Sequence, residues 1–319
     1  MKEICFAGGC FWGVQHFFAG VDGVLEATSG YAQGAPAFEG RPSYEQVYTD
    51  TTGFAETVRV RYNPERISLE TLTDLYFSII DPLSLNRQGH DEGTRYRTGV
   101  YYTDAADLPV LKAVFQRVAE RISAQTGMQV SLAVELEPLR NFYEAEERHQ
   151  DYLGKNPEGY CHLPFKVFKY LRLYQDIEAL IAGEPDTVAR MAESAALIFE
   201  RMKFFWVGFY RVAPAAKPGS EELVLGPFQG PSACLRIAFG RGVCGTAWKE
   251  ARTVVVPDVE AFPGHIACSS LSRSEIVVPV FGSGAQSGKV SAVLDIDSTS
   301  LGTFDDVDAL WLEKICRLI

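Results

Sequence analysis

The sequence lacks a C-x-x-C pair, a long apolar run and an excess of basic residues. Without a C-x-x-C pair, a structural zinc site is not expected, because its ligands usually come in closely spaced pairs. No run approaches the 18 apolar residues of a membrane span, and the N-terminal stretch lacks the pattern of a signal peptide. Acidic residues outnumber basic ones by 41 to 30, which argues against a surface for nucleic acid or anionic membranes. We therefore expect a cytoplasmic protein.

Cysteine is present, but not in the pattern of a disulfide framework. The seven cysteines are odd in number and widely spaced, in a chain without an export signal. Redox chemistry of free thiols is the leading interpretation. The cysteines are Cys5, Cys10, Cys161, Cys234, Cys244, Cys268 and Cys316.

The length of 319 residues suits two domains, and the pattern changes character near residue 169. The first part predicts strands over 57–62 and 129–138 and a helix over 68–80. The second part predicts an antiparallel sheet between helices, which makes the fold class α+β. Its expected elements are a helix over 186–203, strands over 204–212, 222–228, 253–259, 275–281 and 289–297, and a helix over 304–319.

The stretch AGGCFWG, residues 7–13, places Cys10 where an expected strand turns through two glycines into a helix. In one interpretation Cys10 is an inert core residue. In the other, the helix N-terminus lowers the pKa of the thiol and makes it a nucleophile. Phe11 and Trp12 would then line an apolar slot beside it. The helix is expected to carry all three residues in its first turn.

Four further segments offer side chains for a site with this thiol: Tyr44, Glu56, Asp91 with Tyr96, and Cys161. Taken singly, each has a structural explanation. The tyrosines could be half-buried core residues, the carboxylates solvated surface charges, and the cysteine a small buried residue.

Together, the motifs GGCFWG, TTGFAE, NRQGHDEGTRYR and KNPEGYC occur in the order typical of one family. Residues 1–169 resemble the A-type methionine sulfoxide reductases, which form a two-layer α/β sandwich and reduce the S epimer. The resemblance implies that Cys10 is the nucleophile and that Glu56 protonates the sulfoxide oxygen. It also implies that Phe11 and Trp12 hold the substrate methyl group.

The same resemblance assigns supporting roles to four other residues. Tyr44 and Tyr96 would donate hydrogen bonds to the sulfoxide oxygen, and Asp91 would be a supporting carboxylate. Cys161, expected on a mobile tail, would condense with the sulfenic acid of the nucleophile to form a disulfide. Thioredoxin is the reductant that the family implies.

The segment GRGVCG, residues 240–245, matches the G-x-G-x-x-G pattern of a dinucleotide site. The helical stretch that follows is too short for a βαβ crossover. We expect neither a nucleotide cofactor nor a metal.

The cysteine trio of the second part carries a better pattern. Together with WVGFY and VLDIDS, its spacing resembles the GAF-type free methionine-(R)-sulfoxide reductases over residues 170–319. The resemblance implies a GAF-like fold in which Cys268 is the nucleophile, Cys234 the resolving thiol and Cys244 an auxiliary.

In that resemblance Trp206 and Tyr210 line the methyl pocket, while Glu275, Asp295 and Asp297 bind the ammonium and sulfoxide groups. Three carboxylates in one small pocket are costly unless a cation enters or one is protonated. A free amino acid supplies the cation, whereas a methionine within a peptide does not. The alternation of the strand alone allows the other interpretation, in which both aspartates face solvent.

The sequence departs from the family patterns at Phe54, Ile80 and Ser269. The leading hypothesis is a bifunctional enzyme that reduces both epimers in separate domains. In a second hypothesis, the C-terminal domain is a ligand-sensing GAF module that regulates an N-terminal reductase. In a third, the chain is a peroxide sensor, but this leaves Phe11 and Trp12 without a purpose.

Overall fold

A computed structural model describes residues 1–38, 40–215, 219–264, 269–282 and 287–319. The chain divides into two compact units, Met1–Phe168 and Lys169–Ile319. Both combine a sheet with helices, which confirms the predicted α+β class. Among the described residues, no helix is both long and apolar enough to cross a bilayer.

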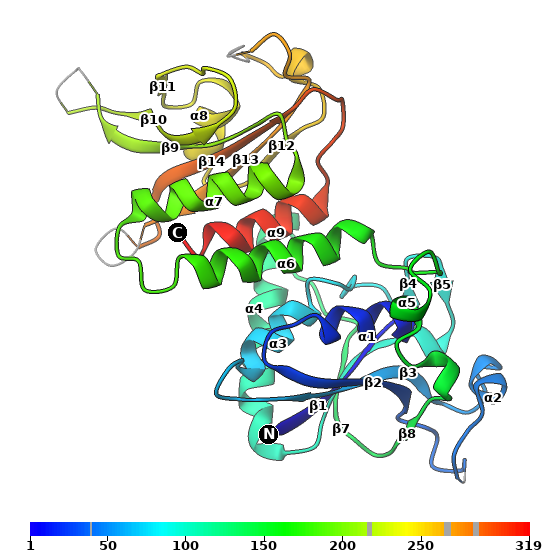
Figure 1. The fold of residues 1–319 in the computed structure, drawn as a ribbon. Helices are drawn as coiled ribbons and strands as arrows, with labels where there is room; N and C mark the ends of the chain where they lie inside the picture. Colours follow the sequence, from blue (N-terminus) through cyan, green and yellow to red (C-terminus); the bar gives the residue numbers. More distant parts are fainter. Residues whose placement is uncertain (39, 216–218, 265–268, 283–286) are drawn as a thin grey trace. The chain divides into compact units, whose positions relative to one another are not determined.

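The first unit is built on a six-stranded sheet with the order β7-β6-β1-β3-β2-β8 (Figure 1). Strands β6 and β7 pair in parallel, and the other pairs are antiparallel. Helix α1 packs on the strands β1 to β3, and α3 packs against α4. The main elements of this unit are β1 (Lys2–Gly8), α1 (Phe11–Ala19), β2 (Val24–Ala32), α2 (Tyr44–Tyr48), β3 (Ala55–Tyr62), α3 (Leu69–Tyr76), β6 (Thr98–Tyr102), α4 (Leu108–Thr126), β7 (Glu135–Pro138), β8 (Phe142–Glu144) and α5 (Tyr152–Lys155).

Local sequence explains most of these elements. Alternate residues of β3, including Val58 and Val60, are buried, as the strand pattern predicts. Helix α3 begins after Ser68, whose side chain accepts a hydrogen bond from the backbone N–H of Thr71. The prediction for 129–138 is wrong in its first part, because only Glu135–Pro138 pairs with the sheet.

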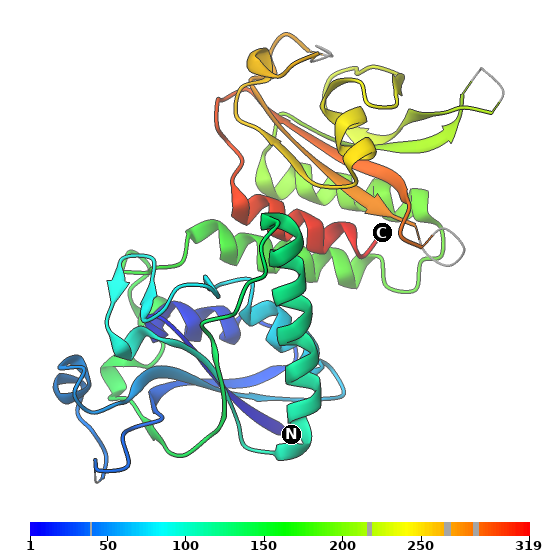
Figure 2. The ribbon, with the colours of Figure 1, turned by 180° about the vertical axis from the view of Figure 1, so that it is seen from behind.

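The second unit is an antiparallel six-stranded sheet with the order β11-β10-β9-β14-β13-β12. Helices α7 and α9 cover one face, and α8 covers the other (Figures 1 and 2). Helix α8 leads into a strand that pairs antiparallel, so this segment is not a βαβ unit. The main elements are α6 (Phe165–Leu180), α7 (Thr187–Met202), β9 (Trp206–Pro214), β10 (Glu221–Gln229), β11 (Arg236–Ala238), α8 (Gly242–Glu250), β12 (Val254–Val256), β13 (Ser274–Phe281), β14 (Val290–Ser298) and α9 (Asp306–Cys316).

Strand alternation sorts the side chains of this sheet onto its two faces. In β9, Trp206 and Tyr210 lie in the core cluster under α8, and the intervening Val207 and Phe209 are buried on the opposite face. Val277 of β13 also belongs to the α8 cluster. Polar residues two positions away from such residues therefore point toward α8.

The closing helix α9 is anchored by a buried carboxylate. Asp308 accepts a hydrogen bond from the Tyr170 hydroxyl at 2.8 Å and, as the reciprocal half of a capping box, one from the backbone N–H of Asp305 at 2.9 Å. The buried face therefore runs through Asp308 and Trp311, whereas Val307 of the predicted apolar stripe is only half-buried.

This anchor leads to a stability prediction. Asp308→Ala leaves the buried Tyr170 hydroxyl without this acceptor and removes the capping box, so we expect unfolding to become easier by about 1–3 kcal/mol. Asp306→Ala changes an exposed neighbour in the same turn and should cost about 0.5 kcal/mol or less. Urea denaturation followed by tryptophan fluorescence measures both. Equal midpoints for the two variants would contradict the prediction.

Candidate functional site

Cys10 lies where β1 ends and α1 begins. It is the N-cap of α1, so the helix starts at Phe11, one residue later than expected. Gly9, with φ of 81°, makes the turn, and an added side chain there would collide with Gln88. The Cys10 side chain is buried, with 5% of its surface exposed.

The expectation that the helix lowers the pKa of this thiol is wrong for the ligand-free structure. Burial raises the pKa of Cys10 well above its usual value, and the nearby charge of Glu56 raises it further. The backbone N–H of Trp12 acts in the opposite direction, but it is outweighed. Cys10 is therefore a protonated thiol in the free pocket.

Glu56 comes from β3 and is buried beside Cys10. The backbone N–H of Phe11, at the start of α1, donates a hydrogen bond to its Oε2 atom at 3.0 Å. Burial raises the pKa of Glu56 to about 8, although this hydrogen bond and the charge of Arg95 lower it. At neutral pH the carboxyl group is mostly protonated, so it can donate a proton.

Tyr44 and Tyr96 lie near both of these groups. Burial raises the pKa of Tyr44 to about 12, and the charges of Glu56 and Cys10 add to the shift. Burial and Glu56 also raise the pKa of Tyr96. Both hydroxyls stay protonated and can donate hydrogen bonds.

Asp91 accepts a hydrogen bond from the Tyr160 hydroxyl at 2.7 Å. Its Oδ2 atom is buried and has no hydrogen-bond partner among the described residues. The charge of Asp91 contributes to the raised pKa values of both Glu56 and Cys10, so this carboxylate belongs to the same cluster.

Cys161 is half-buried and close to the start of α1. A side chain added at Gly13 would place its Cβ 3.0 Å from the Cys161 sulfur. The segment is held on both sides of the thiol by the Tyr160 hydrogen bond to Asp91 and by one from the His162 ring to the Gly8 carbonyl at 3.0 Å. The expected mobility of this tail stays a prediction.

An aromatic recess of about 630 Å³ opens beside Trp12. Phe11 is buried behind it, and the Trp12 indole stacks on the Tyr152 ring with centroids 3.7 Å apart. The recess is lined by Trp12, Tyr44, Glu45, Tyr48, Arg148, His149 and Tyr152. Its walls are apolar with one acidic and one basic group at hand, which suits a thioether side chain in a polypeptide.

Sequence analysis missed two side chains that support this site. The Arg95 guanidinium lies over the rings of Tyr48 and Tyr96, 4.2 and 4.4 Å from their centroids, and pairs with Asp50 at 2.5 Å. His149 contacts Trp12. Both stand inside the motif segments, but only tertiary structure reveals these partners.

The departures from the family pattern are packing residues of the first unit. Phe54 is buried against Phe38 and Tyr143, with ring centroids 5.5 and 5.8 Å away. Ile80 lies against Gly8, where an added Cβ would be 3.1 Å from its side chain.

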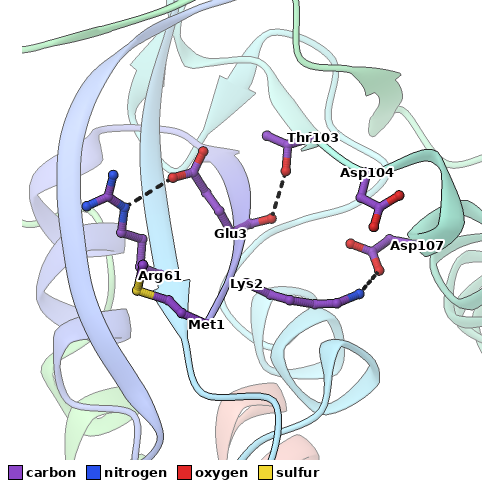
Figure 3. Close-up of a pocket in the computed structure, with 7 residues that line it drawn as sticks. All are labelled: Met1, Lys2, Glu3, Arg61, Thr103, Asp104 and Asp107. Carbon is purple, nitrogen blue, oxygen red and sulfur yellow. Dashed lines mark hydrogen bonds and ion pairs between the residues drawn. The ribbon is translucent and has the colours of Figure 1, made fainter.

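A different recess near the N-terminus carries charge but no thiol. It is drawn in Figure 3, where Lys2 pairs with Asp107 at 2.6 Å and Arg61 with Glu3 at 3.2 Å. Its lining residues are Met1, Lys2, Glu3, Arg61, Thr103, Asp104 and Asp107. These ion pairs satisfy one another on the surface, and we assign the recess no role in the chemistry.

The second unit brings Cys244 of α8 together with Glu275 of β13 and Asp295 of β14. All three are buried, and their ligand atoms lie within 4.8 Å of one another. Strand register explains the meeting, since Glu275 pairs with Asp297 and Asp295 pairs with Gly208 on the face under α8. One sulfur and two carboxyl groups form a donor set that can hold a cation.

The electrostatics of this cluster follow from its burial. Burial, with the repulsion between neighbouring carboxylates, raises the pKa of Glu275 and Asp295 well above their usual values. Burial raises the pKa of Asp297 to about 6. The interpretation that both aspartates face solvent is wrong for Asp295, whose Oδ1 atom is buried without a hydrogen-bond partner among the described residues.

Aromatic rings and a thiol-bearing loop lie beside these carboxyl groups. Trp206 donates a hydrogen bond from Nε1 to the Pro231 carbonyl, and the Tyr210 hydroxyl donates to the carbonyl of Cys234, both at 3.0 Å. Cys234 is half-buried and packs against the α8 cluster. The expected nucleophile Cys268 lies outside the described residues, whereas Ser269 is described and accepts a hydrogen bond from Leu271.

Comparison with known proteins agrees with this division. The family described as peptide methionine sulfoxide reductase matches residues 2–178, and the GAF domain family matches residues 110–319. "Peptide methionine sulfoxide reductase MsrA" of Clostridium acetobutylicum is 48% identical over 169 residues, 53% of this chain and 99% of the relative. "GAF domain-containing protein A" of Dictyostelium discoideum is 50% identical over 154 residues, 48% of this chain and 92% of the relative.

A solved structure of "free methionine-R-sulfoxide reductase" from Neisseria meningitidis in complex with its substrate is 52% identical. It covers 47% of this chain and 84% of its own chain, with a TM-score of 0.43. The first family match spans more than half of the chain and includes Cys10 and Glu56. The chain therefore belongs to the peptide methionine sulfoxide reductase family, carries a C-terminal GAF domain, and is a methionine sulfoxide reductase.

Proposed function

We propose that the chain is a bifunctional reductase with one site in each unit. The first unit, residues 1–169, reduces the S epimer of methionine sulfoxide, free or in proteins, and the second, residues 170–319, reduces the free R epimer. The observation that carries the proposal is the recurrence of buried carboxyl groups beside a thiol in both units. Because the sulfoxide sulfur is chiral, a pocket that fixes its methyl group and oxygen accepts one epimer, so two epimers need two sites.

In the first unit, Glu56 supplies the proton that activates the substrate. A sulfoxide sulfur is a poor electrophile until its oxygen is protonated, and general acid catalysis by a carboxyl group with a raised pKa meets that need. Tyr44 and Tyr96 donate hydrogen bonds to the same oxygen, while Phe11 and Trp12 hold the methyl group.

The first chemical step transfers the oxygen to Cys10. Its sulfur attacks the sulfoxide sulfur as the oxygen takes up the proton of Glu56; the S–O bond then breaks and methionine leaves. The thiol proton restores Glu56, so that in sum a thiol and a sulfoxide become a sulfenic acid and a thioether. Asp91 supports the site as a neighbouring carboxylate.

Cys161 closes the first half of the cycle. Its thiol attacks the sulfenic sulfur, forms a disulfide with Cys10 and releases water. A dithiol reductant, thioredoxin in our proposal, then reduces the disulfide by exchange and becomes oxidised itself. The position of Cys161 over the first turn of α1 supports this pairing.

In the second unit, the carboxyl cluster selects a free amino acid. Glu275, Asp295 and Asp297 bind the substrate ammonium and polarise the sulfoxide, with Trp206 and Tyr210 lining the methyl pocket. Cys268 is the proposed nucleophile, Cys234 the resolving thiol and Cys244 an auxiliary thiol. The raised pKa values of the carboxyl groups support this proposal, because an entering cation compensates for the ionisation that burial opposes.

The two-site proposal predicts a selective loss. Cys10→Ser should abolish reduction of the S epimer and leave reduction of the R epimer unchanged, because the nucleophiles lie in separate units. Each resolved epimer of free methionine sulfoxide is incubated with enzyme and dithiothreitol, and methionine is measured. Cys5→Ser, at a buried cysteine of β1, is the matched control and should keep both activities. Loss of both activities in Cys10→Ser would overturn the proposal.

The role of Glu56 predicts a pH dependence. The carboxyl group must be protonated to act, so kcat/KM for the S epimer should fall as pH rises through about 8, its raised pKa. Glu56→Gln should reduce the single-turnover rate by about 10²- to 10⁴-fold and remove this alkaline decline. Glu45→Gln, at an exposed carboxylate of the neighbouring recess, should retain it. An unchanged pH profile in Glu56→Gln would show that another group is the acid.

The carboxyl cluster predicts selectivity for a free amine. Glu275→Gln should reduce R-epimer turnover by about 30-fold or more, since it removes a charge-assisted contact. Glu221→Gln, at an exposed position of β10, should leave it unchanged. R-methionine sulfoxide acylated at its amine should not react with the wild-type enzyme. Equal rates for blocked and free substrate would refute the free-amino-acid assignment and favour the sensor interpretation of the GAF domain.

A further inference from the structure

The imidazole of His149 lies behind two walls of the proposed sulfoxide pocket. His149 ends the short 3-10 helix η3 (Glu147–His149), and only 5% of its surface is exposed. Its ring centroid is 5.4 Å from that of Phe11, 5.7 Å from that of Trp12 and 4.6 Å from that of Tyr44. The proposed mechanism leaves this buried titratable group without a task.

The two ring nitrogens of His149 both face N–H donors. Nδ1 lies 3.3 Å from the indole Nε1 of Trp12, and Nε2 lies 3.3 Å from Nε of Arg148. A neutral imidazole has one acceptor nitrogen, and indole and guanidinium groups only donate. One of the two contacts must therefore give way.

The surroundings favour the bond from Trp12. The Arg148 side chain is exposed and already pairs with Glu45 at 3.0 Å, so its Nε–H can turn to water. The carboxylate of Glu146 lies 4.0 Å from Nε2 of His149 and attracts a proton onto that nitrogen. With the proton on Nε2, Nδ1 is free to accept from the indole of Trp12.

Glu146 ties the same segment to Tyr44. Its carboxylate accepts hydrogen bonds from the Tyr31 hydroxyl at 2.7 Å and from the backbone N–H of Tyr44 at 3.0 Å. Burial alone would raise the pKa of Glu146, but these bonds lower it overall, so the group is ionised at neutral pH. The residues 146–149 thus hold both Trp12 and Tyr44 against the pocket.

We propose that His149 is a positioning residue for S-sulfoxide reduction, which accepts the Trp12 indole N–H and packs the Tyr44 ring in place. This inference rests on the roles proposed above for Trp12 and Tyr44. His149 acts through them and does not itself touch the substrate.

The same geometry makes the device sensitive to acid. Burial lowers the pKa of His149 below its usual 6.5, so the ring is neutral at pH 7. Protonation at lower pH places a hydrogen on Nδ1, opposite the indole N–H, and breaks the bond. The charged and titratable groups facing the ring among the described residues are Glu146 and Arg148 from its own segment and Tyr44 and Glu45 from α2; α1 contributes Phe11 and Trp12.

Two variants separate the acceptor from the packing. His149→Phe keeps a ring of similar size but removes the acceptor, and His149→Asn keeps an acceptor oxygen in place of Nδ1. We expect His149→Phe to raise KM for the S epimer about three- to tenfold with little change in kcat, because Trp12 holds the methyl group before and during the reaction. His149→Asn should restore at least half of this loss. A wild-type KM in His149→Phe would overturn the inference.

The indole N–H signals of the full-length protein supply a readout independent of activity. The chain has four tryptophans, and the signal that disappears in Trp12→Phe belongs to Trp12. On lowering the pH from 8 to 5, this signal should shift with a midpoint below 6.5 in the wild type and stay in place in His149→Asn. A Trp12 signal that does not titrate, or that titrates equally in both proteins, would overturn the positioning role. Failure of the wild type to reduce the S epimer would instead overturn the proposed function.

Discussion

Burial of carboxyl groups beside a thiol is the constraint on which both units depend. An ionised carboxylate in an apolar site is costly, so the group retains its proton unless a cation or hydrogen bonds compensate. Glu56 receives one backbone N–H bond, which is too little to restore its usual pKa. Glu275 and Asp295 repel each other and lie even further from their usual values. Both pockets therefore store protons, which is the property that sulfoxide reduction requires.

Ordinary secondary structure produces this burial. In the first unit, a strand ends at a two-glycine turn and the next helix directs its first N–H group at Glu56 on a neighbouring strand. In the second, the period of two along β13 and β14 places Glu275 and Asp295 on the face that α8 covers. Each polar group is carried by an element whose apolar residues fix its position, so the sites inherit the rigidity of the sheets.

The sequence predicts the elements and the chemical groups better than their energetics. Period-two alternation was sufficient for β3, whereas residues 129–134 read as a strand although only the part from Glu135 finds a partner along β6. Motif order brought the right residue types together, yet the direction of the Cys10 pKa shift was predicted wrongly. The helix N-terminus is visible in the sequence, but the depth of burial that outweighs it depends on strands and loops far away in the chain. The partners of Arg95 are hidden for the same reason.

The raised pKa of Cys10 also decides between hypotheses for this unit. A peroxide sensor needs an accessible thiolate, because the thiolate is the species that peroxides oxidise. Cys10 is buried and protonated in the free pocket, so peroxide meets an unreactive thiol. A sulfoxide differs from peroxide because its oxygen can accept the proton of Glu56 while its methyl group fills the aromatic recess. The burial that keeps both groups protonated thus ties the reactivity of the thiol to the presence of a sulfoxide, and this favours a reductase over a sensor.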